Sequence, residues 1–210
     1  MALMGRDLMK IFGFYIAEIN MINQHEKVNK LLEEYKELFN NELGEYNGEI
    51  IDLKIKEGVK PIFMKPRPIA FAFKCTVESE LDRLEKLKVI TKVDNAEWGT
   101  PLVPILKPDG KIRVGADYKM TVNKALEDIK YLLPRIDELF ATLQGGEHFT
   151  ILDLSRAYNQ LKVSETTRLL LAWSIHRGIY AMNRFPFGTK PAVAIFQRIM
   201  DKSFARLRYG

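Results

Sequence analysis

The sequence has 210 residues, of which 47% are hydrophobic and 28% charged, a balance that is ordinary for a globular protein and excludes wholesale disorder. Its net charge of +5 is concentrated in the interval 54–113, where 13 Lys and Arg face 8 Asp and Glu; this basic segment suits nucleic acid, and a solvated face without a partner is the alternative interpretation. Cys75 is the only cysteine, which excludes a disulfide framework or a zinc site built on cysteines and favours a reducing compartment.

The first 40 residues predict no membrane span and one helix. The apolar stretch 11–22 is too short for a bilayer and contains Glu18. No secretory signal is visible, so we expect an intracellular protein that is not secreted. Apolar residues at helical spacing predict a helix over 25–39.

Extended chain and a second helix are expected next. Alternating apolar residues predict a strand over 48–56, and three prolines make the stretch 60–68 extended and irregular. Thr76 is the expected N-cap of the following helix. The apolar face of that helix consists of Val77, Leu81, Leu84 and Leu87.

The second half of the chain mixes hairpins and helices. The expected elements are a hairpin of strands 101–106 and 111–116 turning at 107–110, a short helix from Pro134 to Gly145, a strand at 149–154 running into a helical segment from Ser155, a hairpin of strands 169–175 and 179–185, and a helix over 192–207 with Phe196, Ile199, Met200, Ser203 and Leu207 on its buried face. Because strands and helices alternate without a βαβ rhythm, we predict an α+β fold with mainly antiparallel sheets.

Asp153 is the residue whose position points most directly to chemistry. A carboxylate at the junction of a strand and a helix is presented by rigid backbone, where it can hold a hard cation such as Mg²⁺. The alternative is that Asp153 simply caps the helical segment that begins near Ser155.

The residues around Asp153 resemble a known catalytic motif. The stretch from Phe149 to Leu161 is similar to the first catalytic motif of the reverse transcriptases of gypsy-type LTR retrotransposons and retroviruses. Further landmarks occur in the family's order and spacing: Glu97 to Pro104, Lys107 to Arg113, Asp117 to Asn123, Leu133 to Ile136, His176 to Tyr180, Arg184 to Gly188 and Ala194 to Asp201. The resemblance implies a right-hand polymerase fold, represented by fingers and a partial palm.

The resemblance also implies roles for single residues. Asp153, with the backbone of Leu154, would bind Mg²⁺, with Mn²⁺ as a possible substitute. Tyr158 would be a steric gate that rejects a 2′-hydroxyl, with plain core packing as the alternative. The remaining roles are triphosphate lining by the backbone of Leu154, Ser155 and Ala157, nucleotide contacts by Arg113, Lys107 and Lys111, a position beside the nucleotide pocket for Phe187 and Gly188, and nucleic-acid contacts by Gln197 and Arg198.

Four regions and a set of partners follow from the same resemblance. Residues 1–22 are expected to be the remnant of a retroelement aspartic protease, or an ordinary amphipathic start; 23–60 would be a connector, 61–148 the fingers and 149–210 the partial palm. The implied partners are an RNA template, a DNA primer, deoxynucleoside triphosphates and the rest of a Pol polyprotein. The implied location is the cytoplasm or a virus-like particle.

One departure from the family bears on activity. The family's Tyr-x-Asp-Asp turn is missing, and no two aspartates are adjacent anywhere in the sequence. Because two-metal nucleotidyl transfer needs carboxylates from both motifs, we expect the isolated chain to be an inactive fragment of an RNA-directed DNA polymerase. The alternative is a non-catalytic nucleic-acid-binding or degenerate retroelement-derived protein.

Overall fold

The computed structural model describes residues 26–36, 42–108, 110, 112–146 and 153–204, and the chain forms two compact units. One unit comprises residues 1–42 and 133–155, and the other comprises 43–132 and 156–210. The first unit contains helices α3 (Glu26–Glu34) and α6 (Ile136–Thr142). None of the helices in the described ranges is long and apolar enough to cross a membrane.

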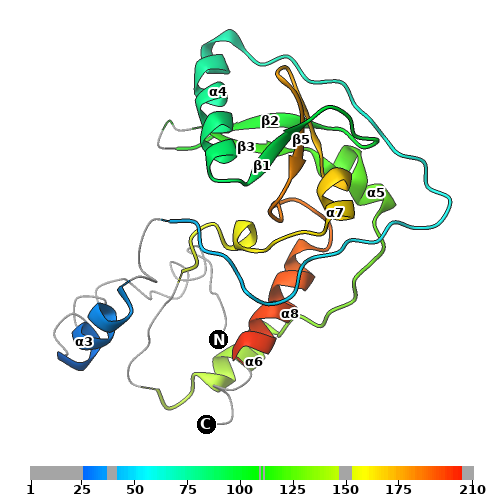
Figure 1. The fold of residues 1–210 in the computed structure, drawn as a ribbon. Helices are drawn as coiled ribbons and strands as arrows, with labels where there is room; N and C mark the ends of the chain where they lie inside the picture. Colours follow the sequence, from blue (N-terminus) through cyan, green and yellow to red (C-terminus); the bar gives the residue numbers. More distant parts are fainter. Residues whose placement is uncertain (1–25, 37–41, 109, 111, 147–152, 205–210) are drawn as a thin grey trace. The chain divides into compact units, whose positions relative to one another are not determined.

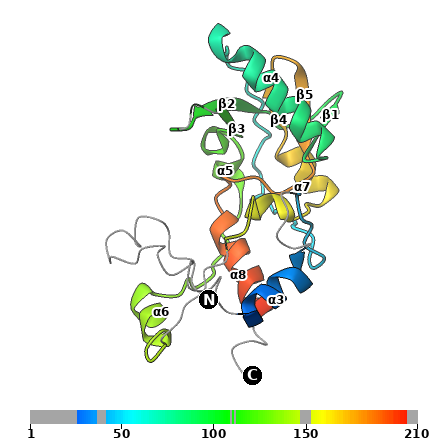
Figure 2. The ribbon, with the colours of Figure 1, turned by 90° about the vertical axis from the view of Figure 1, so that its left-hand side faces the viewer.

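The second unit is built on a sheet of five strands in the order β1-β5-β4-β2-β3 (Figures 1 and 2). Every neighbouring pair is antiparallel except β2 and β4, which run parallel. This arrangement confirms the predicted α+β fold. The strands are β1 (Ile90–Val93), β2 (Thr100–Leu106), β3 (Ile112–Ala116), β4 (Trp173–Ile175) and β5 (Gly178–Met182).

Helices surround this sheet. The long helix α4 lies along it and contacts β1 and β3, while α8 runs away from it (Figures 1 and 2). The buried face of α4 is formed by Val77, Leu81 and Leu84, as the apolar spacing predicts. The helices and 3₁₀ turns of this unit are α4 (Phe71–Lys86), η3 (Tyr118–Met120), α5 (Val122–Ala125), η4 (Ala157–Gln160), α7 (Glu165–Leu170) and α8 (Ala192–Phe204).

A buried chain of hydrogen bonds links strand β4 to the 3₁₀ turn at Tyr118. The Trp173 indole N–H donates to the Tyr118 hydroxyl at 2.7 Å, and that hydroxyl donates to the Leu171 carbonyl at 3.1 Å. Both rings are almost inaccessible, so each polar atom needs its protein partner. Burial raises the pKa of Tyr118, which therefore stays a neutral donor.

The segment before α4 is extended, as predicted, and is fastened at several points. Ile51 and Leu53 are buried, in agreement with the predicted alternation. The predicted strand is not part of the sheet, because its backbone pairs only through single bridges, from Ile51 to Val163 and from Ile55 to Leu126. Ion pairs add to these bridges: Glu45 with Arg184 and Lys162, and Glu49 with Arg198 and Lys202.

Three predictions about these elements are wrong. Thr76 is not an N-cap, because α4 begins at Phe71; its first turn is exposed to water, which satisfies the free N–H groups without a side-chain cap. Leu169 and Leu170 belong to α7 rather than to a strand, since the Ser164 side chain accepts from the Thr167 N–H and starts a helix there. Ser203 is exposed and Ile195 takes its place on the buried face of α8.

Both predicted hairpins form, and some other predictions concern residues that the structure does not describe. The hairpin of β2 and β3 is confirmed, and Gly110 has the predicted positive φ of 77°. The hairpin of β4 and β5 also forms, although both strands are shorter than predicted. Most of the predicted strand 149–154, together with the proposed protease remnant 1–22, lies outside the described residues. The boundaries of the four predicted regions stay predictions.

Candidate active site

Tyr158, the predicted steric gate, lies in a cluster of aromatic rings. Its ring centroid is 5.1 Å from that of Phe196 on α8, 6.4 Å from that of Phe185 and 5.8 Å from that of Phe187. Phe185 and Phe196 are buried, whereas Phe187 is 63% exposed. Burial raises the pKa of the Tyr158 hydroxyl. The ring is therefore anchored in the core on one side and reaches a partly open surface on the other.

Arg113 joins the same cluster from strand β3. Its guanidinium carbon lies over the Phe187 ring, 5.4 Å from the ring centroid, a cation–π arrangement. Within the described part of the chain, no acidic side chain pairs with Arg113. The structure thus brings together Arg113, Tyr158 and Phe187, which lie far apart in the sequence.

The loop that carries Phe187 and Gly188 is fixed by Asn123. The Asn123 amide donates to the Gly188 carbonyl at 2.9 Å, and its oxygen accepts from the Lys190 N–H at 2.8 Å. Gly188 has φ of +93°, a conformation that side chains disfavour. The sequence shows Asn123 as one of the family landmarks, but only the structure shows that it clamps this loop.

Asp153, Leu154 and Ser155 belong to the other compact unit, where all three are exposed. Neither Asp153 nor Leu154 is in a regular strand or helix. Ala157 begins the short 3₁₀ helix η4 in the second unit. The residue before it, Arg156, has a φ of 50°, a left-handed conformation that residues other than glycine rarely adopt. Strain of this kind is typical of functional segments.

Gln197 and Arg198 both have protein partners on or near α8. Gln197 donates to Asp201 at 3.2 Å, and Asp201 also accepts from the Tyr131 hydroxyl at 2.7 Å. Arg198 pairs with Glu49 at 2.5 Å, and hydrogen bonds from Lys202 and Arg198 lower the pKa of Glu49. The predicted nucleic-acid contacts of these two residues stay predictions.

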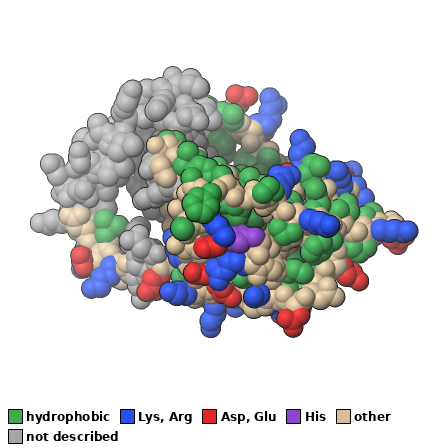
Figure 3. Space-filling model, turned by 90° about the horizontal axis from the view of Figure 1, so that it is seen from above, with side chains coloured by type: hydrophobic (Ala, Val, Ile, Leu, Met, Phe, Trp, Pro, Cys, Tyr) green, Lys and Arg blue, Asp and Glu red, His purple; other side chains and the backbone are tan. Residues whose placement is uncertain are grey.

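The charged surface is mixed rather than uniformly basic. Figure 3 shows basic and acidic side chains interspersed on the face seen from above, with hydrophobic side chains between them. Lys107 is exposed beside the tip of the β2–β3 hairpin, and Lys111 lies outside the described residues. Arg67 pairs with Asp117 at 2.8 Å, so part of the basic segment serves the fold.

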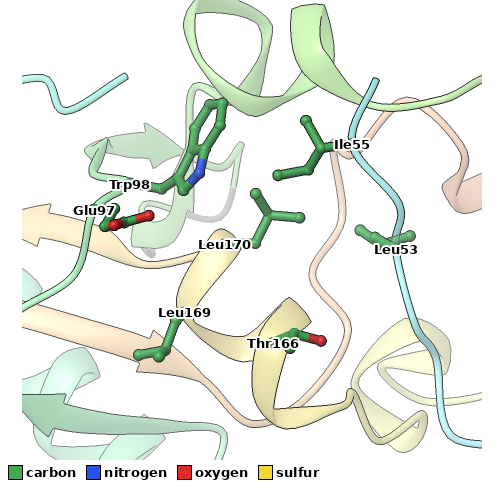
Figure 4. Close-up of a pocket in the computed structure, with 7 residues that line it drawn as sticks. All are labelled: Leu53, Ile55, Glu97, Trp98, Thr166, Leu169 and Leu170. Carbon is green, nitrogen blue, oxygen red and sulfur yellow. The ribbon is translucent and has the colours of Figure 1, made fainter. Parts of the chain in front are cut away.

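A cavity in the second unit is separate from the predicted site. It has a volume of about 290 Å³, and Trp98, Ile55 and Leu170 point toward one another across it (Figure 4). Leu53, Glu97, Thr166 and Leu169 complete its lining. None of the residues predicted to bind nucleotide lines it.

A complete metal centre is not visible in the part of the chain that the structure describes, since no three His, Cys, Asp or Glu side chains gather there in a way that could hold an ion. The exposed Asp153 carboxylate is a ligand of the kind that Mg²⁺ or Mn²⁺ prefers. One carboxylate supplies only part of a two-metal site.

Solved structures with the same fold are reverse transcriptases. A prototype foamy virus protease–reverse transcriptase aligns over 88% of this chain and 25% of its own, with a TM-score of 0.77 and 24% identity. A foamy viral protease–reverse transcriptase solved in complex with an RNA/DNA hybrid aligns over 90% of this chain and 26% of its own, with a TM-score of 0.72 and 20% identity. At these identities the likeness establishes the fold.

Sequence comparisons establish the family. Residues 105–209, half of the chain, match the family described as reverse transcriptase (RNA-dependent DNA polymerase). An uncharacterized protein of Caenorhabditis elegans is 36% identical over 90% of this chain and 15% of its own length. The Pol polyprotein of transposon opus from Drosophila melanogaster is 31% identical over 84% of this chain and 18% of its own. The chain belongs to the reverse transcriptase family and spans less than a fifth of these two relatives.

Proposed function

We propose that this chain is the fingers and first half of the palm of an RNA-directed DNA polymerase within a Pol polyprotein. The observation that carries the proposal is the meeting of Arg113, Tyr158 and Phe187 on one side of the second unit. A flat guanidinium suits a triphosphate and a base, and an anchored tyrosine ring suits steric selection against a 2′-hydroxyl. The substrates are deoxynucleoside triphosphates on a template–primer duplex.

The residues divide the chemistry among them. Arg113 neutralises the triphosphate and orients it, Lys107 adds positive charge beside the hairpin tip, and by the family resemblance Lys111 adds to that charge. Tyr158 excludes ribonucleotides through the fixed position of its ring. By the family resemblance, the backbone of Leu154, Ser155 and Ala157 would line the triphosphate, and Gly188 would lie beside the nucleotide pocket. Gln197 and Arg198 contact the template strand.

Asp153, with the Leu154 carbonyl, would hold Mg²⁺ or Mn²⁺, and the metal supplies charge for activating the primer 3′-hydroxyl and the leaving pyrophosphate. Oxygen ligands of this type fit both ions. Because the 210 residues contain no adjacent aspartate pair, we expect no primer extension by this chain alone. The proposed centre needs further carboxylates besides Asp153.

The proposal is tested first by nucleotide selection in a binding assay. The 210-residue chain is mixed with a chain-terminated RNA/DNA template–primer and Mg²⁺, and the matched deoxynucleotide or ribonucleotide is titrated in. We expect the deoxynucleotide to bind more tightly, and Tyr158→Ala to abolish that preference. Tyr35→Ala, at an exposed tyrosine of the other unit, is the matched control and keeps it. Equal binding of both nucleotides by the unsubstituted chain contradicts the proposal.

Primer extension supplies the second test. RNA template, DNA primer and all four deoxynucleotides are incubated with the chain in Mg²⁺ or Mn²⁺, and the products are resolved by length. We expect extension to be absent here and present in a longer polyprotein segment that carries the Tyr-x-Asp-Asp turn. Asp153→Asn in that longer segment abolishes the product if Asp153 binds the metal, and persistent product refutes the role.

A second candidate function is nucleic-acid binding without catalysis. The observation in its favour is that exposed lysines of the basic segment, such as Lys65, Lys74 and Lys107, form no ion pair with the described acidic residues. Binding to RNA/DNA duplex that weakens steeply with salt, together with no response to any nucleotide, would favour this function over the first.

A further inference from the structure

Phe187 occupies an unusual place for a phenylalanine. Its side chain is 63% exposed, so core burial accounts for little of its environment. Its ring meets the Tyr158 ring at an interplanar angle of 62° and is covered by the Arg113 guanidinium. One exposed ring therefore joins the two residues to which the proposed function assigns nucleotide selection and triphosphate binding.

The ring is held firmly enough to serve as a platform. The N–H of Phe185 donates to the Leu161 carbonyl at 2.9 Å, and Asn123 clamps Gly188 and Lys190 on the other side. The loop is therefore tied down on both sides of Phe187. The Tyr158 ring, itself anchored against Phe196, also contacts the Phe187 ring.

Arg113 needs such a platform. It is exposed on β3, and its long side chain loses conformational entropy whenever its guanidinium is fixed on a ligand. An aromatic face holds a guanidinium flat by cation–π attraction while leaving the N–H donors at its edge free. No described acidic residue competes for those donors.

We propose that Phe187 is a positioning residue that holds the Arg113 guanidinium ready for the incoming nucleotide before the nucleotide arrives. This inference rests on the proposed function. It adds to that function an explanation of how the Arg113 guanidinium is held in place before the nucleotide binds. It requires an aromatic ring at position 187: an aliphatic side chain of similar size would still pack against Tyr158 but would leave Arg113 without its platform.

A double-mutant cycle tests the coupling. The variants are Phe187→Leu, Arg113→Ala and the two combined, and dTTP with Mg²⁺ is titrated into each chain bound to a chain-terminated template–primer. We expect Phe187→Leu alone to weaken dTTP binding about two- to fivefold, the range of an exposed cation–π contact. In the Arg113→Ala background the same change has no further effect, because there is no guanidinium left to position.

Two further variants separate positioning from packing. Phe187→Tyr keeps the aromatic face and should bind dTTP as the unsubstituted chain does. Phe71→Leu makes the same replacement at a phenylalanine that is 93% exposed at the start of α4, and should also leave binding unchanged. Equal affinity of the Phe187→Leu and unsubstituted chains overturns the inference.

Side-chain NMR of the protein without nucleotide gives an independent readout. The Arg113 Nε and Cδ protons should show an upfield ring-current shift that disappears in Phe187→Leu and persists in Phe71→Leu. An unshifted Arg113 signal, or additive effects in the cycle, refutes the positioning role while leaving the proposed function standing. Failure of the unsubstituted chain to bind dTTP while the NMR shift is present instead refutes the proposed function, and with it the purpose assigned to the platform.

Discussion

The Asn123 side chain offers the sharpest test of how the site is held in place. Asn123→Ala removes the donor to the Gly188 carbonyl and the acceptor for the Lys190 N–H, and both backbone groups lie within three residues of Phe187 in the sequence. The change deletes only short polar atoms from a partly buried position, so no large cavity forms. We expect the loop of Gly188 and Lys190 to lose its attachment to α5 and the chain to become less stable.

The magnitude follows from the two bonds. Each contributes about 1 kcal/mol net, so the free energy of unfolding should fall by about 1–2 kcal/mol. In a chain of this size each kcal/mol corresponds to about 2–4 °C, so the melting temperature should fall by about 2–8 °C. Urea unfolding followed by fluorescence, together with calorimetry, measures both quantities.

Two companion variants sharpen the test. Asn123→Asp keeps the oxygen that accepts from the Lys190 N–H and removes the donor to Gly188. Its free energy of unfolding should therefore fall by about half as much as that of Asn123→Ala. Lys124→Ala changes the exposed neighbour and should leave stability within about 0.5 kcal/mol of the unsubstituted chain. A loss below about 0.3 kcal/mol for Asn123→Ala would show that the two hydrogen bonds do not hold the loop. The clamp would then be discarded as the support of Phe187.

Three further predictions concern the scaffold. Tyr118→Phe leaves the Trp173 indole N–H and the Leu171 carbonyl unpaired in the core. We therefore expect the free energy of unfolding, measured in urea, to fall by about 2–4 kcal/mol, and a fall below about 1 kcal/mol would contradict this. Gly188→Ala should cost about 1–2 kcal/mol from its positive φ, whereas Gly115→Ala in β3, where φ is not positive, should be tolerated. The lowered pKa of Glu49 makes its pairing with Lys202 and Arg198 stabilising above the usual carboxyl pKa of 4.5, and that contribution disappears as pH falls through the lowered pKa. Glu49→Gln should therefore destabilise the chain at pH 7 and flatten the acid side of its stability profile, and an unchanged profile would refute the pairing.

Local rules predicted the elements that depend on neighbouring residues. The β2–β3 hairpin follows from the turn residues at 107–110, and the buried face of α4 follows from apolar spacing. The boundary at Thr76 failed because a good cap residue is not sufficient to start a helix. The backbone preceding it was already helical, and its exposed first turn can be satisfied by water.

Long-range pairings were beyond the reach of those rules. Strand β2 pairs in parallel with β4, and Glu49 pairs with Arg198 although 149 positions separate them. The same holds for the site: the family resemblance singled out Arg113, Tyr158 and Phe187 separately, but no periodicity in the sequence indicates that they meet. Only the tertiary fold brings a hairpin, a 3₁₀ turn and a loop to one place.

The family motifs are better evidence of membership in the family than of catalytic activity. Several landmarks serve packing: a Cβ added at Gly99 would lie 2.5 Å from the Phe63 ring, and Tyr118 holds the buried indole. Asn123, another landmark, fastens a loop through two hydrogen bonds between its side chain and backbone atoms of Gly188 and Lys190. A chain can retain all of these and still lack catalytic carboxylates. The proposed activity therefore rests on Asp153 together with further carboxylates, and the proposed recognition of nucleotide rests on the contacts among Arg113, Phe187 and Tyr158.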